Sequence, residues 1–243
     1  MLAIELPDAV VQLLAVIGIN FPEVNEDHVR ELGSQVREFA QNVGQTHQDA
    51  TDTITQMGQA YQGASYEALV QRWSEMSSQH MTELQDACSV VATAMDAAAD
   101  FIVAEKVAAI AELVAMAAAF VADQAAAAVT FGLSELALPL IEEGARKLCE
   151  YLEQQLTQYV VGKVIEAAIT PLVGVVDKAV SGFVFQAAAS ALGEGGSGGA
   201  VGSSFMMQPD QLNTHASTML DHAATMQQHA DTFSSNVSAL TFT

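Results

Sequence analysis

Small and apolar side chains recur every seven residues from about residue 26 to residue 61, and this spacing predicts one long helix with a coiled-coil-like seam. Two series, four residues apart, make up the seam: Val29, Val36, Val43, Ala50 and Met57 in the first, and Gly33, Ala40, His47, Ile54 and Tyr61 in the second. Because the repeat holds over about five heptads, we expect the helix to pack against a second helix along most of its length.

A second long helix is predicted after Gly63, where the seven-residue spacing resumes. Its main series is Tyr66, Trp73, His80, Ala87, Ala94 and Phe101, and an adjoining series contains Leu69, Met76, Leu84, Val91 and Ala98. Since only a few residues separate the two helices, an antiparallel hairpin over about residues 26–100 is the expected arrangement. The predicted hairpin seam is formed by Val36, Val43, Ile54, Met57, Tyr66, Trp73, Leu84 and Val91.

The sequence Tyr61-Gln62-Gly63 marks the turn of this hairpin. Glycine readily adopts the left-handed backbone conformation that ends a helix and reverses the chain. An aromatic side chain just before it can cover the turn. We therefore predict that Gly63 is a left-handed C-cap and that Tyr61 covers the hairpin tip.

Further helices are predicted around the hairpin, so the expected fold class is all-α: a long antiparallel hairpin extended by further packed helices into an elongated bundle. Residues 7–17 should form a short helix that ends at Gly18. The alanine-rich stretch 97–130 is predicted to be helical and largely buried. After a break at 130–134, additional helices are expected, so that residues 1–190 form one helical domain.

A flexible linker rich in glycine and serine is predicted at residues 191–207, followed by a C-terminal amphipathic helix at 208–243. One row of this helix contains Leu212, Met219, Met226 and Phe233, and a second row contains Ala216, Ala223, Ala230 and Val237. Alanine next to large side chains suits a close helix–helix contact. We expect the helix to dock, through its row of large side chains, on the bundle or on a partner.

The charge of the chain narrows the classes of partner. Its 243 residues carry a formal net charge of −21, which disfavours nucleic acid and anionic lipid surfaces and favours a neutral or basic protein. The first residues lack the basic region of a secretory signal. No stretch reaches the roughly 18–20 apolar residues of a membrane span. Neither a nucleic-acid partner nor a stable membrane span is therefore expected.

Candidate chemistry in the sequence is sparse. No nucleophile–base pair, cleft with paired carboxylates or phosphate-binding glycine loop is recognisable, so no enzymatic activity, cofactor or metal is predicted. Cys88 and Cys149 lack the spacing of a metal finger, and whether they pair stays open.

Histidines offer two further candidates. His215, His222 and His229 repeat every seven residues on the C-terminal helix, either as a polar flank of its seam or as a pH-sensitive stripe. His47 and His80 both fall on the hairpin seam and are expected to be near neighbours, as a structural pair or as a metal or pH site.

The hairpin break is similar to the W-x-G signature of the WXG family of type VII secretion substrates, with Tyr61 in place of tryptophan. Residues 1 to about 190 also look like the WXG-like N-terminal domain of the actinobacterial CpnT-type family (channel protein with necrosis-inducing toxin). That wider resemblance rests on four segments: 17–27, 63–69 followed by Trp73, 104–106 and 130–134. It implies an export module placed ahead of a toxin and paired with a small WXG hairpin.

Together, these observations lead to the hypothesis of a non-enzymatic type VII secretion substrate, an export or adaptor module of a polymorphic-toxin system that acts by helix–helix recognition. Its partners would be a small WXG-type hairpin or a second copy, together with the secretion machinery. It would leave the cell by a leaderless route and be cytoplasmic before export. None of the four tyrosines begins a Tyr-x-x-x-Asp/Glu export motif, so the partner would supply that motif.

Two alternative functions stay open. One is a membrane-active or channel-forming helical protein, suggested by the apolar segments 101–142 and 164–193. The other is a cytosolic helical scaffold.

Overall fold

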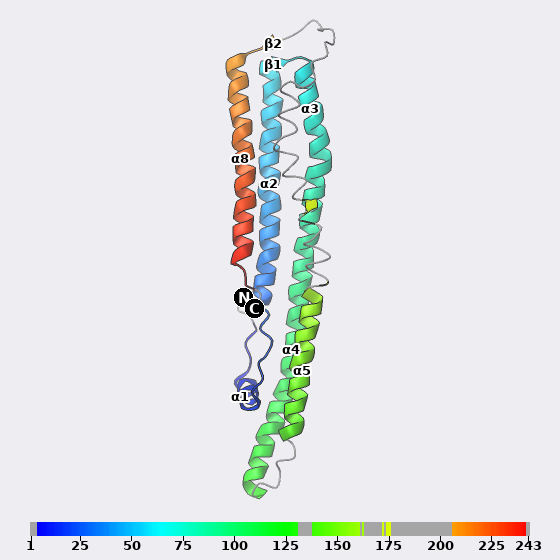
Figure 1. The fold of residues 1–243 in the computed structure, drawn as a ribbon, viewed down its shortest axis with the longest axis vertical. Coiled ribbons are helices and arrows are strands. Elements are labelled where there is room, and N and C mark those ends of the chain that lie inside the picture. The colour runs from blue at the N-terminus through cyan, green and yellow to red at the C-terminus, as the bar shows by residue number, and fades with distance from the viewer. Residues whose placement is uncertain are drawn as a thin grey trace. The chain divides into compact units, whose positions relative to one another are not determined.

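The computed structural model describes residues 4–130, 138–160 and 206–241, together with residues 162, 172, 174 and 175. It is built from the helices α1 (Asp8–Ile17), α2 (Glu26–Ala60), α3 (Ala64–Met76), η1 (Ser77–Met81), α4 (Thr82–Thr130), α5 (Leu138–Tyr159) and α8 (Pro209–Ala239), and from two short strands, β1 (Tyr61–Gln62) and β2 (Met206–Met207) (Figure 1). The predicted all-α helical bundle is confirmed.

Three predicted features lie outside the described residues. These are the break at 131–134, almost all of the additional helices expected between residues 161 and 190, and the linker up to residue 205. The last two residues of the predicted linker, Met206 and Met207, form strand β2.

Two compact units contain the described elements, and each is considered by itself. The first unit comprises residues 1–32, 94–167 and 240–243, and the second comprises residues 33–93 and 168–239.

Local sequence signals set the ends of the first two helices. Helix α1 ends at Gly18, whose φ of 69° and ψ of 36° place it in the left-handed region. The amides of Gly18 and Ile19 both donate to the carbonyl of Leu14, as in a Schellman-type cap. Helix α2 begins after Asn25, whose Oδ1 accepts from the amides of Asp27 and His28 at 3.0 and 3.2 Å. The predicted end of the first helix is confirmed.

The core of the first unit forms where α1 packs on α4 and α5. Its buried cluster contains Val10, Leu14, Leu113, Ala145 and Cys149. Phe101 of α4 stacks on Tyr159 of α5 with ring centroids 4.0 Å apart, whereas the later part of α4 meets the beginning of α5. Helices α4 and α5 are therefore antiparallel.

A buried ion pair joins α2 to α4 in the same unit. Lys106 Nζ lies 2.7 Å from Glu26 Oε2, and the two side chains are only 6% and 2% exposed. Lys106 also donates to the carbonyl of Val24, and Glu26 Oε1 accepts from the amide of Ile4 at 2.7 Å. Burial alone would raise the pKa of Glu26, but these hydrogen bonds outweigh it and hold the pKa below its ordinary value. The pair therefore ties the N-terminal segment and the connector before α2 to α4.

The second helix of the hairpin is longer than predicted. Instead of ending near residue 100, the helical chain continues from α3 through η1 and α4 to Thr130. The sequence from 64 to 130 contains neither glycine nor proline, so nothing in it favours a break.

The π-helical turn η1 changes the seam on this helix. A π turn contains about one residue more than an α turn, so every later seven-residue row is displaced by about one position. The predicted row His80, Ala87, Ala94 and Phe101 is accordingly only half-buried, whereas Met81, Cys88, Met95 and Ile102 are almost fully buried. Leu84, Val91 and Ala98, predicted as the adjoining row, are buried.

The expectation that residues 97–130 are largely buried is wrong. One face of this part of α4 is buried, with Ile102 and Leu113 at 0% exposure. On the opposite side, Val107, Val114 and Val121 are 53%, 41% and 61% exposed. Because alanine and valine occur on both sides of the helix, the apolar composition could not distinguish the buried face from the exposed one.

The buried ion pair predicts a specific loss of stability. Lys106→Met should lower the free energy of unfolding by about 3–5 kcal/mol, because it leaves the Glu26 carboxylate buried without its counter-charge. The double variant Glu26→Leu/Lys106→Met should lose less, since no charge remains buried. Urea unfolding followed by circular dichroism measures both. The matched control is Lys147→Met, which removes an exposed pair with Glu143 and should change the midpoint little.

The ion pair between Glu26 and Lys106 also determines the direction in which folding stability changes with pH. Because the pKa of Glu26 is lowered in the folded state, its contribution is present above the ordinary carboxyl range and is lost as the pH falls through the folded-state pKa. Acidification should therefore destabilise the wild type more than the double variant. Equal acid sensitivity of the two proteins would contradict this assignment.

Candidate functional site

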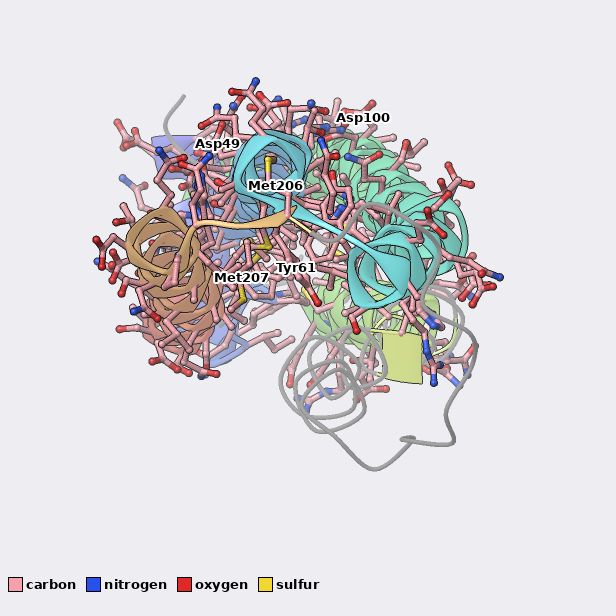
Figure 2. All side chains as sticks on the ribbon, turned by 90° about the horizontal axis from the view of Figure 1, so that it is seen from above. Asp49, Tyr61, Asp100, Met206 and Met207 are labelled. Atoms are coloured by element: carbon pink, nitrogen blue, oxygen red, sulfur yellow. The ribbon has the colours of Figure 1, made fainter. Side chains whose placement is uncertain are left out.

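The candidate site is the tip of the hairpin, where α2 gives way to α3. Strand β1 pairs antiparallel with β2, so that Tyr61 lies opposite Met207 and Gln62 opposite Met206 (Figure 2). The amide of Gln208 then donates to the carbonyl of Ala60 at 2.8 Å. This carbonyl lies at the end of α2, where no further turn of the helix can satisfy it. The segment before α8 therefore closes the tip, which the sequence did not reveal.

Gly63 occupies a backbone conformation that differs from the prediction. Its φ of 150° and ψ of 175° lie outside the left-handed helical region, in a region that essentially only glycine populates. The residue does not cap α2, because β1 already separates it from that helix. Its carbonyl instead accepts from the amides of Tyr66 and Glu67 at 3.0 and 3.2 Å and thereby starts α3. A glycine is needed here, but because the chain reverses through an extended backbone conformation with positive φ and not because it ends α2 as a left-handed C-cap.

Two tyrosines pack at the tip. Tyr61 is half-buried and meets Tyr66 edge to face, with ring centroids 6.3 Å apart. The hydroxyl of Tyr66 donates to the carbonyl of Ile54 at 3.1 Å, so its ring lies across α2 at Gly58. A Cβ on Gly58 would lie 2.4 Å from that hydroxyl oxygen. Tyr66 therefore contributes to the tip together with Tyr61, and Gly58 is the residue that admits its ring.

The residues predicted for the hairpin seam are found at two levels of burial. Val36, Val43, Ile54, Met57, Leu84 and Val91 are buried, whereas Tyr66 and Trp73 are half-buried.

His47 stacks on Trp73, with ring centroids 4.9 Å apart and planes 11° apart. Trp73 Nε1 also donates to Thr51 Oγ1 at 2.8 Å. The stacking partner of His47 is thus Trp73. Burial lowers the pKa of His47, which favours the neutral imidazole in this stack.

Helix α8 packs on the side of α2 that carries Phe39, Thr46 and Thr53 (Figure 1). We call this side the outer face of α2. Phe233 stacks on Phe39 with centroids 4.9 Å apart. His229 Nε2 lies 3.1 Å from Thr46 Oγ1, and His222 Nε2 lies 3.1 Å from Thr53 Oγ1. Two histidines of the stripe, His222 and His229, therefore lie in the helix–helix contact.

The predicted docking rows of α8 differ in exposure. Leu212, Met219, Met226 and Phe233 are half-buried. In the alanine row, Ala216 and Ala223 are exposed, and Ala230 and Val237 are half-buried. Sequence reasoning missed Thr46 and Thr53, which read as polar surface positions. Their spacing of seven residues, equal to that of the histidines, was the signal that could have found them.

The described residues contain no group of three or more His, Cys, Asp or Glu side chains that could hold a metal ion. Cys88 and Cys149 are buried free thiols. Burial raises the pKa of Cys88 to about 11 and also raises that of Cys149, so neither is an activated nucleophile. No described helix is long and apolar enough to cross a bilayer.

A groove of about 490 Å³ with a mixed polar and apolar lining lies in the first unit between α1 and the connector to α2. Lys106 contributes to its lining, but its ammonium is already held by Glu26 and Val24. The groove therefore presents no unpaired cation to an acidic ligand.

A family model described as a WXG100-like domain matches residues 3–138, which is more than half of the chain. No curated protein and no solved structure gives a significant match. The matched region contains the complete hairpin tip from Gly58 to Tyr66, although not β2 and α8.

Gly58→Ala tests the packing at the tip. Alanine favours a helix over glycine by about 1 kcal/mol, but its Cβ would clash with the Tyr66 ring. The variant should therefore lose about 1–3 kcal/mol of unfolding free energy, and the further change Tyr66→Leu should recover most of it. Urea unfolding gives both values.

The matched control is Gly144→Ala in α5, where the added Cβ would meet the Met116 side chain at ordinary contact distance, 3.4 Å from Cε and 3.8 Å from Sδ. It should leave stability unchanged or raise it. If Gly58→Ala stabilised the protein as much as Gly144→Ala does, the tip packing described above would be wrong.

Proposed function

Because the chain belongs to the WXG100-like domain family, we propose that it is a non-enzymatic substrate or adaptor of a type VII secretion pathway and acts by helix–helix recognition. The family is linked to that pathway. The observation that carries the proposal is the hairpin tip: an aromatic-x-glycine sequence at the reversal of two long helices, with Gly63 in a conformation restricted to glycine.

Two features of the described residues support recognition over chemistry. The side chains at the tip and along α2 are engaged in packing and hydrogen bonds, and the buried thiols have raised pKa values. The exposed positions of α2 are polar, with glutamine, asparagine, glutamate and aspartate prominent among them. Such a surface suits a helix that partner helices recognise by its shape, rather than one that binds a small substrate.

The finer proposal is an export module of a polymorphic-toxin system, similar to the N-terminal domain of the CpnT-type family. It is supported by the resemblance of residues 17–27 and 104–106. In the structure, these two segments are joined by the hydrogen bond from Lys106 to Val24 and the ion pair with Glu26. The resemblance therefore concerns residues that fix the start of α2.

An export assay in the native host tests the proposed function. The tagged chain should accumulate in the culture medium of the parent strain and stay inside the cell in a strain that lacks the type VII secretion ATPase. Gly63→Ala should reduce the exported fraction several-fold, because alanine cannot hold the tip conformation without strain. A cytosolic marker protein corrects for lysis.

Gly144→Ala, which lies far along the chain from the tip, is the matched control and should be exported like the wild type. Unchanged export from the secretion-deficient strain would reject the proposed function. Normal export of a folded Gly63→Ala protein would reject only the role of the tip.

A further inference from the structure

Helix α2 packs on two sides within the second unit. On its inner side, His47, Thr51 and Ile54 contact Trp73 and Tyr66 of α3. On its outer face, Phe39, Thr46 and Thr53 contact α8. The outer face is thus a second helix-binding surface on the same helix.

The contacts on the outer face define an antiparallel register. Going along α2 from Phe39 through Thr46 to Thr53, the contacting residue of α8 moves backwards from Phe233 through His229 to His222. Both the threonines and the histidines repeat every seven residues, so a shift of seven residues would also allow hydrogen bonds, between Thr46 and His222 and between Thr53 and His215. The stack of Phe39 on Phe233 distinguishes the observed register, because such a shift would lose it. An aromatic stack at one end and two side-chain hydrogen bonds give the surface specificity as well as area.

The hydrogen-bond directions at one of these contacts can be assigned. Thr53 Oγ1 donates to the carbonyl of Asp49 at 3.0 Å, so it must accept from His222 Nε2. A histidine that donates through Nε2 can do so whether its other nitrogen is protonated or not. This contact therefore specifies pairing and tolerates both charge states of the ring.

Helix α8 is less buried than the second helix of the hairpin, so the outer contact is the weaker of the two. No residue of α8 is buried, whereas Met81, Leu84, Cys88 and Val91 on the second helix of the hairpin are only 0–5% exposed. Beyond the contacts above, α8 is held at its start by β2 and Gln208. In the first unit, His28 Nδ1 donates to the carbonyl of Thr241, just after α8. A helix held by few, half-exposed contacts separates at a lower free energy than the buried seam.

We propose that the outer face of α2 is a recognition surface for an antiparallel helix with the α8 pattern, that α8 fills it within one chain, and that α8 of a second copy can replace it. The α8 sequence is complementary to this face, because its side chains contact Phe39, Thr46 and Thr53.

The length of the connection also permits exchange. The sequence between the end of α5 at Tyr159 and the start of β2 at Met206 is long, and it contains a run rich in glycine and serine at 193–204. Reciprocal exchange of one element between identical chains is a low-cost route to a dimer. A second copy would be a partner for the proposed function. The binding itself does not depend on that function, but its role in secretion rests on it.

Binding of a fluorescent peptide of residues 206–241 to the full-length protein tests the inference. In the wild type, the chain's own α8 should compete with the peptide. Met226→Asp/Phe233→Asp should unseat that α8 without changing α2, and should tighten peptide binding at least about tenfold by fluorescence anisotropy. Adding Phe39→Asp, which alters the outer face itself, should abolish the gain.

Leu220→Asp is the matched control, because Leu220 lies on α8 but is 72% exposed. It should leave peptide binding at the wild-type level. His222→Ala/His229→Ala is a milder way to unseat α8, should the two aspartates prevent folding. In either unseated variant, circular dichroism should show that the hairpin helices persist.

Mixing two differently tagged wild-type copies gives a second measurement. Co-purification of the two tags after prolonged incubation should occur and should be lost with Phe39→Asp. Failure of a folded, unseated variant to bind the peptide would overturn the inference, as would equal binding by the wild type and that variant. Neither result depends on export, so the proposed function would stand or fall separately in the secretion assay.

Discussion

Helix α2 must satisfy two packing neighbours at once, and the second unit is organised by this constraint. A helix with a single buried side needs one apolar stripe, whereas a helix between two neighbours needs two. The inner stripe of α2 is apolar, with Val43 and Ile54 almost fully buried. The outer face combines one aromatic ring with threonines, and Thr46 and Thr53 are only 5% and 7% exposed. Buried hydroxyls require partners, and the histidines of α8 provide them.

The same constraint explains why the tip is made of strand rather than loop. An ordinary turn would leave the last carbonyl groups of α2 to water. Here the segment before α8 pairs with Tyr61 and Gln62 and satisfies the carbonyl of Ala60. The tip therefore positions the start of α8 beside the end of α2. Gly63 makes this possible, because its extended backbone with positive φ lets β1 run directly into α3.

The sequence was sufficient for features that depend on local or periodic signals. The seven-residue repeats predicted the hairpin, and Gly18 predicted the end of α1. Position 63 was correctly singled out, although its conformation was not, since a glycine can satisfy several unusual values of φ. The π turn at Ser77–Met81 was not predictable, because its sequence contains neither glycine nor proline and its effect is a shift of phase in the residues that follow. The pairing of β1 with β2 was hidden for another reason: it joins residues that lie far apart in the chain.

Polar residues in helix contacts are the hardest to predict from sequence and the most informative about recognition. Thr46 and Thr53 contribute little apolar area, so a repeat defined by hydrophobicity passes over them. Their value lies in the hydrogen bonds with His229 and His222, which a helix without a polar group at those positions would not form. Apolar seams accept many partners, whereas a seam with spaced hydrogen bonds accepts those that match its register. The buried inner seam thus holds the hairpin together. The outer contact, whose α8 side chains are only half-buried, has the chemistry expected of a surface that selects a helix and can release it.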